Sequence, residues 1–237
     1  MIQLSKFDQS DLLKAYKQQT GIDSLGICMR LSFKWLACRY VGGVFKYEKV
    51  NVKKMSEKMD AYSQEAIGML KAADFEGDKR FFASKYVVTD LLKIKDYINK
   101  WGVNVTDANK VVYNNIYCAD SMRTSLPDYI ASRLAVVPIE DMALMITFYM
   151  TMTKQSVQKE LPQVKFEGPD SRILMAGHAV AYFGGDNTFF DPNTGVWQVE
   201  SSKPKEIAEE IEKHIADGYP VTGNNSDRAI LRIAQRD

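Results

Sequence analysis

The chain is organised around the stretch Ser24-Leu-Gly-Ile-Cys-Met-Arg-Leu-Ser-Phe-Lys-Trp-Leu36, which predicts a loop that opens into a buried helix. From Cys28 onward, apolar residues recur with helical spacing at Leu31, Trp35 and Leu36. Cys28 is therefore expected at the N-terminus of the helix, where unpaired N–H groups and the positive end of the helix dipole stabilise an anion. These surroundings favour the thiolate, the nucleophilic form of a cysteine. The stretch alone fits equally well a cysteine that is only a small buried side chain.

Length and composition predict an ordinary globular protein. The chain has 237 residues, of which 46% are hydrophobic and 26% charged, and it contains no linker, repeat or low-complexity tract, so we expect one domain over residues 1–237. A net charge of +1 gives no reason to expect a nucleic-acid partner. No apolar run is long enough for a transmembrane segment, and the N-terminus lacks the apolar core of a signal peptide.

Cysteine usage indicates a reducing environment. Cys28, Cys38 and Cys118 are an odd number, and their spacing matches neither a disulfide framework nor a zinc site. We therefore expect reduced thiols, no metal, no cofactor and a cytosolic place of action.

Helices are predicted in the first two thirds of the chain and strands in the last third, which favours the α+β class. The helix over 8–20 is expected to begin at Asp8 or Ser10 and to end at Gly21, and Thr106 is expected to cap a short helix. The other helices are expected from Cys28 to Gly42-Gly43, over 55–75, over 86–100, and over 204–217 with Ser201 or Ser202 as cap. Strands are expected over 143–150, 172–183, 188–191, 196–200 and 228–236.

The chain has only two histidines, so the search for a base that serves Cys28 is short. His214 lies among charged residues in the middle of a predicted helix, and we expect it on the surface. His178 lies in an apolar strand after Gly177, whose missing side chain leaves room for a ligand or another segment. The alternative for His178 is a core histidine bonded to a backbone carbonyl.

An acid follows His178 across one hairpin. The turn at Gly184–Asn187 predicts antiparallel strands that bring Asp191 back beside His178. Asp191 would then accept the Nδ1–H of His178, fix its tautomer and stabilise the imidazolium. Asp186, at the hairpin tip, is the rival acid, and Asp191 also fits a turn-capping role before Pro192.

Two blocks of sequence together resemble a known family. They read Gly26-x-Cys28-x-x-Leu31-Ser32-x-x-Trp35-Leu36, and Gly177-His178-Ala179-Val180-Ala181 followed by Phe190-Asp191-Pro192-Asn193-x-Gly195. The pattern resembles the YopT-type effector cysteine proteases, over about an eighth of the chain. The resemblance implies Cys28 as nucleophile, His178 as general base and acid, and Asp191 as the residue that orients His178. It also implies a papain-like fold in which the Cys28 helix packs against a C-terminal antiparallel sheet, and the distance along the chain from Cys28 to His178 is comparable with papain-like enzymes.

Two departures from the family pattern bear on this resemblance. Only 27 residues precede Cys28, whereas relatives carry a longer leader, which fits a shortened chain or a catalytic module of a larger toxin. Papain-like enzymes also place a side-chain oxyanion donor shortly before the nucleophile, where this chain has Asp23. An ionised carboxylate cannot donate. Asp23 would therefore offer its backbone N–H or hold a proton, unless Gln18 or Gln19 supplies the donor.

The resemblance implies a cysteine endopeptidase that hydrolyses peptide bonds through a thioester. It would be a secreted bacterial effector or toxin domain, a virulence factor acting in the host cytoplasm, whose relatives cleave host signalling proteins such as lipidated small GTPases or kinases, often at membranes. Two alternatives stay open. The same triad serves a deamidase or acyltransferase, and a papain-like fold also persists in non-catalytic binding modules.

Overall fold

The structure is a computed structural model that describes residues 1–21, 27–40, 42, 45–46, 50–53, 91, 95–96, 98–99, 116–152, 174–219 and 228–235. The helix predicted over 55–75, most of the helix predicted over 86–100, and the predicted cap Thr106 lie outside these residues.

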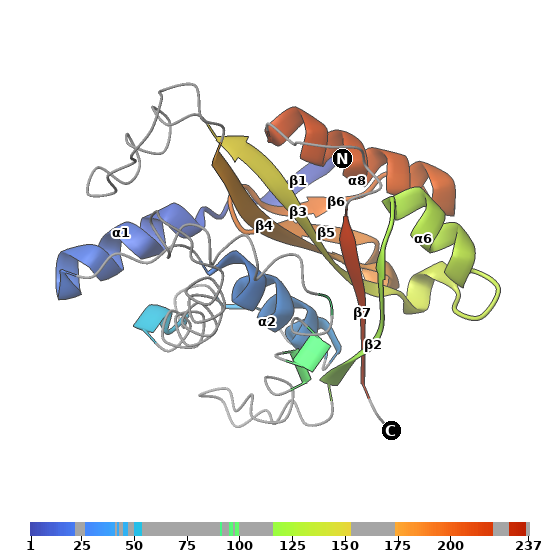
Figure 1. Ribbon diagram of the computed structural model, residues 1–237, viewed down its shortest axis with the longest axis horizontal. Coiled ribbons are helices and arrows are strands. Elements are labelled where there is room, and N and C mark those ends of the chain that lie inside the picture. The colour runs from blue at the N-terminus through green and yellow to red at the C-terminus, as the bar shows by residue number, and fades with distance from the viewer. Residues whose placement is uncertain are drawn as a thin grey trace, which may run out of the picture.

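Seven strands of the described part form one antiparallel sheet in the order β1-β6-β5-β4-β3-β7-β2 (Figure 1). Their bounds are β1 Ile2–Ser5, β2 Ile116–Arg123, β3 Ala143–Met152, β4 Leu174–Phe183, β5 Thr188–Asp191, β6 Gly195–Gln198 and β7 Ala229–Gln235. Strands β3 to β7 are those that the sequence predicts. The edge strands β1 and β2 were not predicted.

The longer helices lie on both faces of this sheet. They are α1 Gln9–Thr20, α2 Cys28–Tyr40, α6 Leu126–Arg133 and α8 Pro204–Gly218, and two short 3-10 helices are η2 Ile139–Asp141 and η3 Gly184–Asp186. Figure 1 shows α2 against one face, and α6 and α8 together against the other. The predicted α+β class, with the Cys28 helix packed on an antiparallel sheet, is confirmed.

Helix α6 was not predicted, and the ends of the other described helices follow the sequence with one exception. Asp8 caps α1 by accepting the Ser10 N–H at 2.8 Å, and Gly21 ends it with φ at 72°, a left-handed conformation that costs glycine nothing. The predicted cap of α8 is wrong. Lys203 is the N-cap and makes no side-chain cap bond, because its ammonium group has no acceptor, and Pro204 starts the helix with a pre-set φ.

Alternation along β4 gives each face of the sheet its own core. Ala179 and Ala181 face α2, and their small side chains let the helix approach closely enough for Ser32 Oγ to donate to Ala179 O at 3.0 Å. The intervening Val180 and Tyr182 belong to the core under α6 and α8. Each large apolar side chain buried in these cores contributes about 1.5–3 kcal/mol. Strand β4 is thus held from both sides, and His178 has the same parity as Val180 and Tyr182.

Candidate active site

The structure brings together the three residues that the sequence singles out. Cys28 is the first residue of α2, His178 lies within β4, and Asp191 is the last residue of β5. His178 Nε2 lies 3.0 Å from Asp191 Oδ1, and the Cys28 side chain is close enough to the His178 ring to raise the pKa of the imidazole. In the antiparallel β4–β5 ladder Ala181 pairs with Phe190, which puts Asp191 level with Val180. His178 is two residues from Val180 along β4, so Asp191 and His178 lie on the same face of the sheet.

The ring nitrogen that meets Asp191 differs from the prediction. We predicted Nδ1–H as the donor, whereas the structure places Nε2 against the carboxylate. The Nε2 side of the ring also meets the Tyr219 hydroxyl at 3.1 Å. Nδ1 is therefore the nitrogen left for Cys28, and the ring bridges thiol and carboxylate with its two nitrogens.

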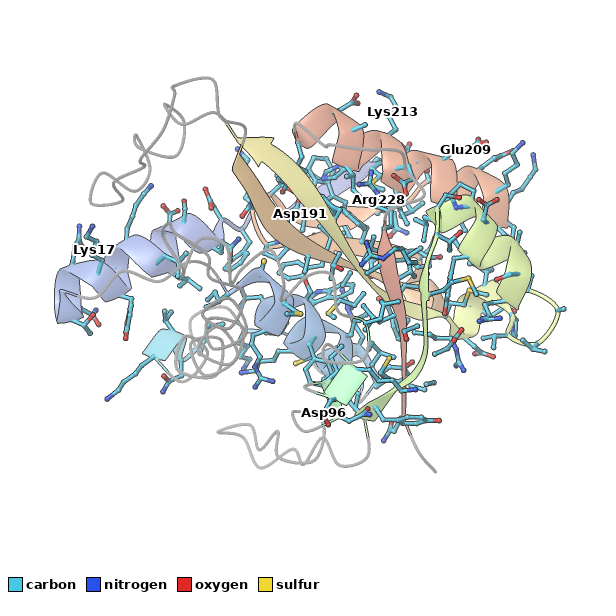
Figure 2. The ribbon with its side chains drawn as sticks, in the orientation of Figure 1. Lys17, Asp96, Asp191, Glu209, Lys213 and Arg228 are labelled. Atoms are coloured by element: carbon cyan, nitrogen blue, oxygen red, sulfur yellow. The ribbon has the colours of Figure 1, made fainter. Side chains whose placement is uncertain are left out.

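Burial makes the His178–Asp191 pair strongly electrostatic. The side chain of His178 is 2% exposed and that of Asp191 is 0% exposed. Figure 2 shows Asp191 in the interior of the protein, at the sheet. Burial opposes the charge on His178, but its hydrogen bonds to Asp191 and Cys28 outweigh that effect and raise its pKa to about 9. Burial likewise opposes the charge on Asp191, but hydrogen bonds from His178 and His214 hold its pKa well below the usual range. At neutral pH the pair is an imidazolium and a carboxylate.

Two further residues on this carboxylate escaped the sequence reading. His214 is not a surface residue as predicted: its side chain is 14% exposed, and its Nε2 lies 3.4 Å from Asp191 Oδ2. Tyr219, just after α8, places its hydroxyl 2.8 and 2.7 Å from the two carboxylate oxygens. The spacing of His214 from Ile207 and Ile211 puts it on their face of the helix, which is the signal that its charged neighbours obscured.

The buried side chain of Gln9 links the two halves of the site. Its Oε1 accepts the N–H of Ile27, the residue before Cys28, at 3.2 Å. Its Nε2 donates to Asn193 Oδ1 at 2.7 Å, and its backbone N–H donates to Pro192 O at 2.7 Å. Gln9, which the sequence did not single out, therefore ties the start of α2 to the turn that follows Asp191.

The oxyanion donor proposed from the sequence lies outside the described residues, because Asp23 falls in the gap between 21 and 27. Gln18 and Gln19, the alternatives, are exposed on the last turn of α1. Helix geometry leaves the N–H of Cys28 without an intrahelical acceptor, and the first turn of α2 contains no acidic residue that would offset the helix dipole. The start of α2 can therefore stabilise a negative charge on sulfur or on an adjacent oxygen.

The described residues show no cluster of metal-ligand side chains. No group of three or more His, Cys, Asp or Glu side chains among them is arranged to hold a metal ion. None of the described helices is long and apolar enough to span a membrane.

Comparison with known proteins gives one structural likeness. No family model and no curated protein matches the chain. The chain is similar to a solved structure titled "Crystal Structure of Pseudomonas Avirulence Protein AvrPphB", with 16% identity and a TM-score of 0.44. The match covers 88% of this chain and 92% of that chain. At this level of similarity the chemistry of the site itself decides the functional inference.

Thiol alkylation is expected to separate Cys28 from the other cysteines. Cys38 and Cys118 are each 2% exposed, and burial raises the pKa of Cys118 to about 11, whereas Cys28 is half-buried beside an imidazolium. Iodoacetamide at pH 6 should label Cys28 at least about tenfold faster than either of the others, as mass spectrometry of peptides would measure. The three should react alike in urea-unfolded protein. Equal rates in the folded protein would contradict an activated thiolate.

Proposed function

We propose that the chain is a papain-like cysteine endopeptidase, with Cys28 as nucleophile, His178 as general base and acid, and Asp191 as the residue that orients His178. The observation that supports this most directly is the buried His178–Asp191 hydrogen bond, with the imidazole in electrostatic reach of Cys28 at a helix N-terminus. A thiol, a base within reach of it and a third group that orients the base are the requirements of nucleophilic catalysis.

The first half of the reaction forms a thioester. The Cys28 thiolate attacks the peptide carbonyl carbon, and the carbonyl electron pair moves to oxygen. The N–H of Cys28 donates to this oxyanion, and Asp23 would supply the second donor through its backbone N–H or a protonated carboxyl; each such donor is worth roughly 3 kcal/mol in the transition state. The Nδ1–H of His178 then protonates the leaving amine as the C–N bond breaks. Asp191 holds the Nε2 side of the ring throughout.

The second half hydrolyses the thioester. Neutral His178 accepts a proton from water through Nδ1, and the resulting hydroxide adds to the acyl carbon. The C–S bond breaks, the acid product leaves, and the thiolate and imidazolium are restored. Because the His178–Asp191 pair is closed to solvent, Asp191 meets the ring without competing water and stabilises each imidazolium that forms.

The biological setting follows from the sequence resemblance. We infer a single papain-like domain over residues 1–237 that acts as a secreted bacterial effector in the reducing cytoplasm of a host cell. Its substrate would be a host protein, with a membrane-associated small GTPase or kinase as the class that the family indicates.

The proposal is tested by expressing the wild type and Cys28→Ala in eukaryotic cells and comparing newly formed protein N-termini by mass spectrometry. We expect new termini with the wild type alone. Glutamines converted to glutamate in uncleaved proteins would indicate a deamidase instead. Acyl groups added to intact proteins would indicate an acyltransferase. Identical proteomes would favour a non-catalytic binding module.

A further inference from the structure

One of the two carboxylate oxygens of Asp191 receives its hydrogen bonds from α8 and from the residue that follows it. Oδ1 faces two N–H groups, His178 Nε2 at 3.0 Å and the backbone N–H of Asn193 at 2.9 Å. Among the described residues, Oδ2 meets donors only from His214 and Tyr219, at 3.4 and 2.7 Å. Asp191 is 0% exposed, and a buried carboxylate oxygen without a donor is costly, so the α8 donors are what satisfies Oδ2.

The Tyr219 hydroxyl has only one hydrogen to give. Oδ1 is already served by two N–H groups, so this hydrogen belongs on Oδ2, and the phenol oxygen is then free to accept. His178 Nε2 lies 3.1 Å from that oxygen, which lets its N–H be shared between Asp191 and Tyr219. The Tyr219 ring also lies over the imidazole, with ring centroids 4.8 Å apart, and Phe148 packs edge-on against both rings. Tyr219 thus bonds to both partners and packs against the imidazole ring.

His214 is held where its Nε2 can reach the carboxylate. Its ring packs edge-on against Phe189 at 5.1 Å and Trp197 at 4.8 Å. The helix that carries it is anchored by the buried side chains of Ile207, Ile211 and Ile215. The backbone N–H of Tyr219 closes the same helix by donating to Ile215 O at 3.0 Å. One packed element therefore presents both donors to Oδ2.

We propose that His214 and Tyr219 are positioning residues that clamp the Asp191 carboxylate so that Oδ1 stays on His178 Nε2. The idea rests on the proposed function, because the clamp matters for catalysis only if His178 serves Cys28. Without the clamp, Oδ2 lacks a donor, and the carboxylate turns to share the donors of Oδ1 or to admit water. The His178–Asp191 bond then lengthens or is lost.

The test uses two substitutions that keep the rings. His214→Phe retains the edge-on packing on Phe189 and Trp197 but removes the donor, and Tyr219→Phe removes only the hydroxyl. Lys213→Met is the matched control: it breaks the exposed ion pair with Asp217 one residue from His214 and touches neither Asp191 nor His178. In NMR spectra of protein labelled with nitrogen-15 histidine, the wild type shows the signals of two imidazoles and His214→Phe shows those of one. The signals that remain in His214→Phe therefore belong to His178.

Two readouts need no substrate. In the wild type, His178 should titrate near pH 9, with an Nε2–H that is protected from exchange. In the double variant, which combines His214→Phe with Tyr219→Phe, we expect the titration midpoint of His178 to fall toward its ordinary value by at least about one pH unit. The reason is that a carboxylate held less firmly against the ring stabilises the imidazolium less. Cys28 alkylation at pH 6 should slow by about tenfold, the effect of losing a hydrogen bond to a charged group. Lys213→Met should change neither.

If the folded double variant has an unchanged titration midpoint of His178 and an unchanged rate of Cys28 alkylation, the proposal is overturned. If the double variant does not fold, Tyr219→Phe alone decides, since it loses a single oxygen atom and must still lower the midpoint and expose the Nε2–H to exchange. The outcomes also separate the clamp from the function. A wild type that cleaves nothing while its variants shift His178 refutes the protease and keeps the clamp, whereas an active wild type with an unshifted His178 refutes the clamp alone.

Discussion

Replacing Cys28 with serine is expected to reduce peptide-bond hydrolysis by on the order of 10⁴-fold or more, while the melting temperature stays near that of the wild type. The hydroxyl has almost the size of the thiol but does not ionise beside His178 in the accessible pH range, so the nucleophile is lost and the fold is not. Cys28 is half-buried at the edge of the core, which makes its contribution to packing small. Initial rates on a cleaved host protein, together with thermal unfolding, measure both quantities.

Cys38→Ser is the matched control, because the same substitution is made in the same helix. Cys38 is 2% exposed and packs in the core between α2 and the sheet, away from the N-terminal turn. We expect it to lower the free energy of unfolding by about 1 kcal/mol and to leave the rate per folded molecule unchanged. A fully active Cys28→Ser protein, or a Cys38→Ser protein that folds but is inactive, would move the nucleophile away from Cys28.

The interior strands could be predicted because their burial is visible in the sequence. Strands β3, β4 and β7 are mostly apolar, and the turns on either side of β5 contain glycine, asparagine and proline. The edge strands lack that signal. Ile2 and Leu4 of β1 are 56% and 55% exposed, so its apolar residues mark no buried face, and β2 contains Asp120, whose charge is met by Arg133 from α6. Pairing with a distant partner, rather than local pattern, makes both of them strands.

The residues of the candidate site also fall into those that the sequence predicts and those that it does not. Cys28, His178 and Asp191 are visible because helix start, strand and hairpin are local features. The residues that surround them belong to elements remote in sequence, so no local pattern relates them to the site. Helix α8 illustrates the reason: the sequence suggested a polar face around Glu212 and His214, yet Glu212 is buried against Arg228 at 2.9 Å. In the sequence, a charged residue that is buried against a partner from a distant element has the same pattern as a surface residue, and only the structure identifies the partner.

The choice between Asp191 and Asp186 leads to the second large effect. Asp191→Ala is expected to lower hydrolysis by on the order of 10³-fold or more, because His178 loses the carboxylate that orients its ring and stabilises its charge. It should also cost about 3–5 kcal/mol of unfolding free energy, since removing one partner of a buried pair leaves the other charge without compensation. Asp191→Asn keeps one acceptor oxygen and should fall between Ala and the wild type in both measurements.

Asp186→Ala should change neither quantity much, although it removes an acid from the same hairpin. The Asp186 carboxylate is 42% exposed and pairs at 2.9 Å with Arg39, which lies in the last turn of α2, at the opposite end of the helix from Cys28. A solvent-exposed pair of this kind is worth about 0–1 kcal/mol. Rates and denaturation midpoints of the Asp191 and Asp186 variants, measured side by side, discriminate between the two acids.

If Asp186→Ala were the more damaging change to the rate, then the buried hydrogen bond at Nε2 would be structural, and the orientation of His178 would have to come from the hairpin tip. The geometry opposes that outcome: Asp186 is bonded to Arg39 and Thr188, while Asp191 holds the imidazole directly.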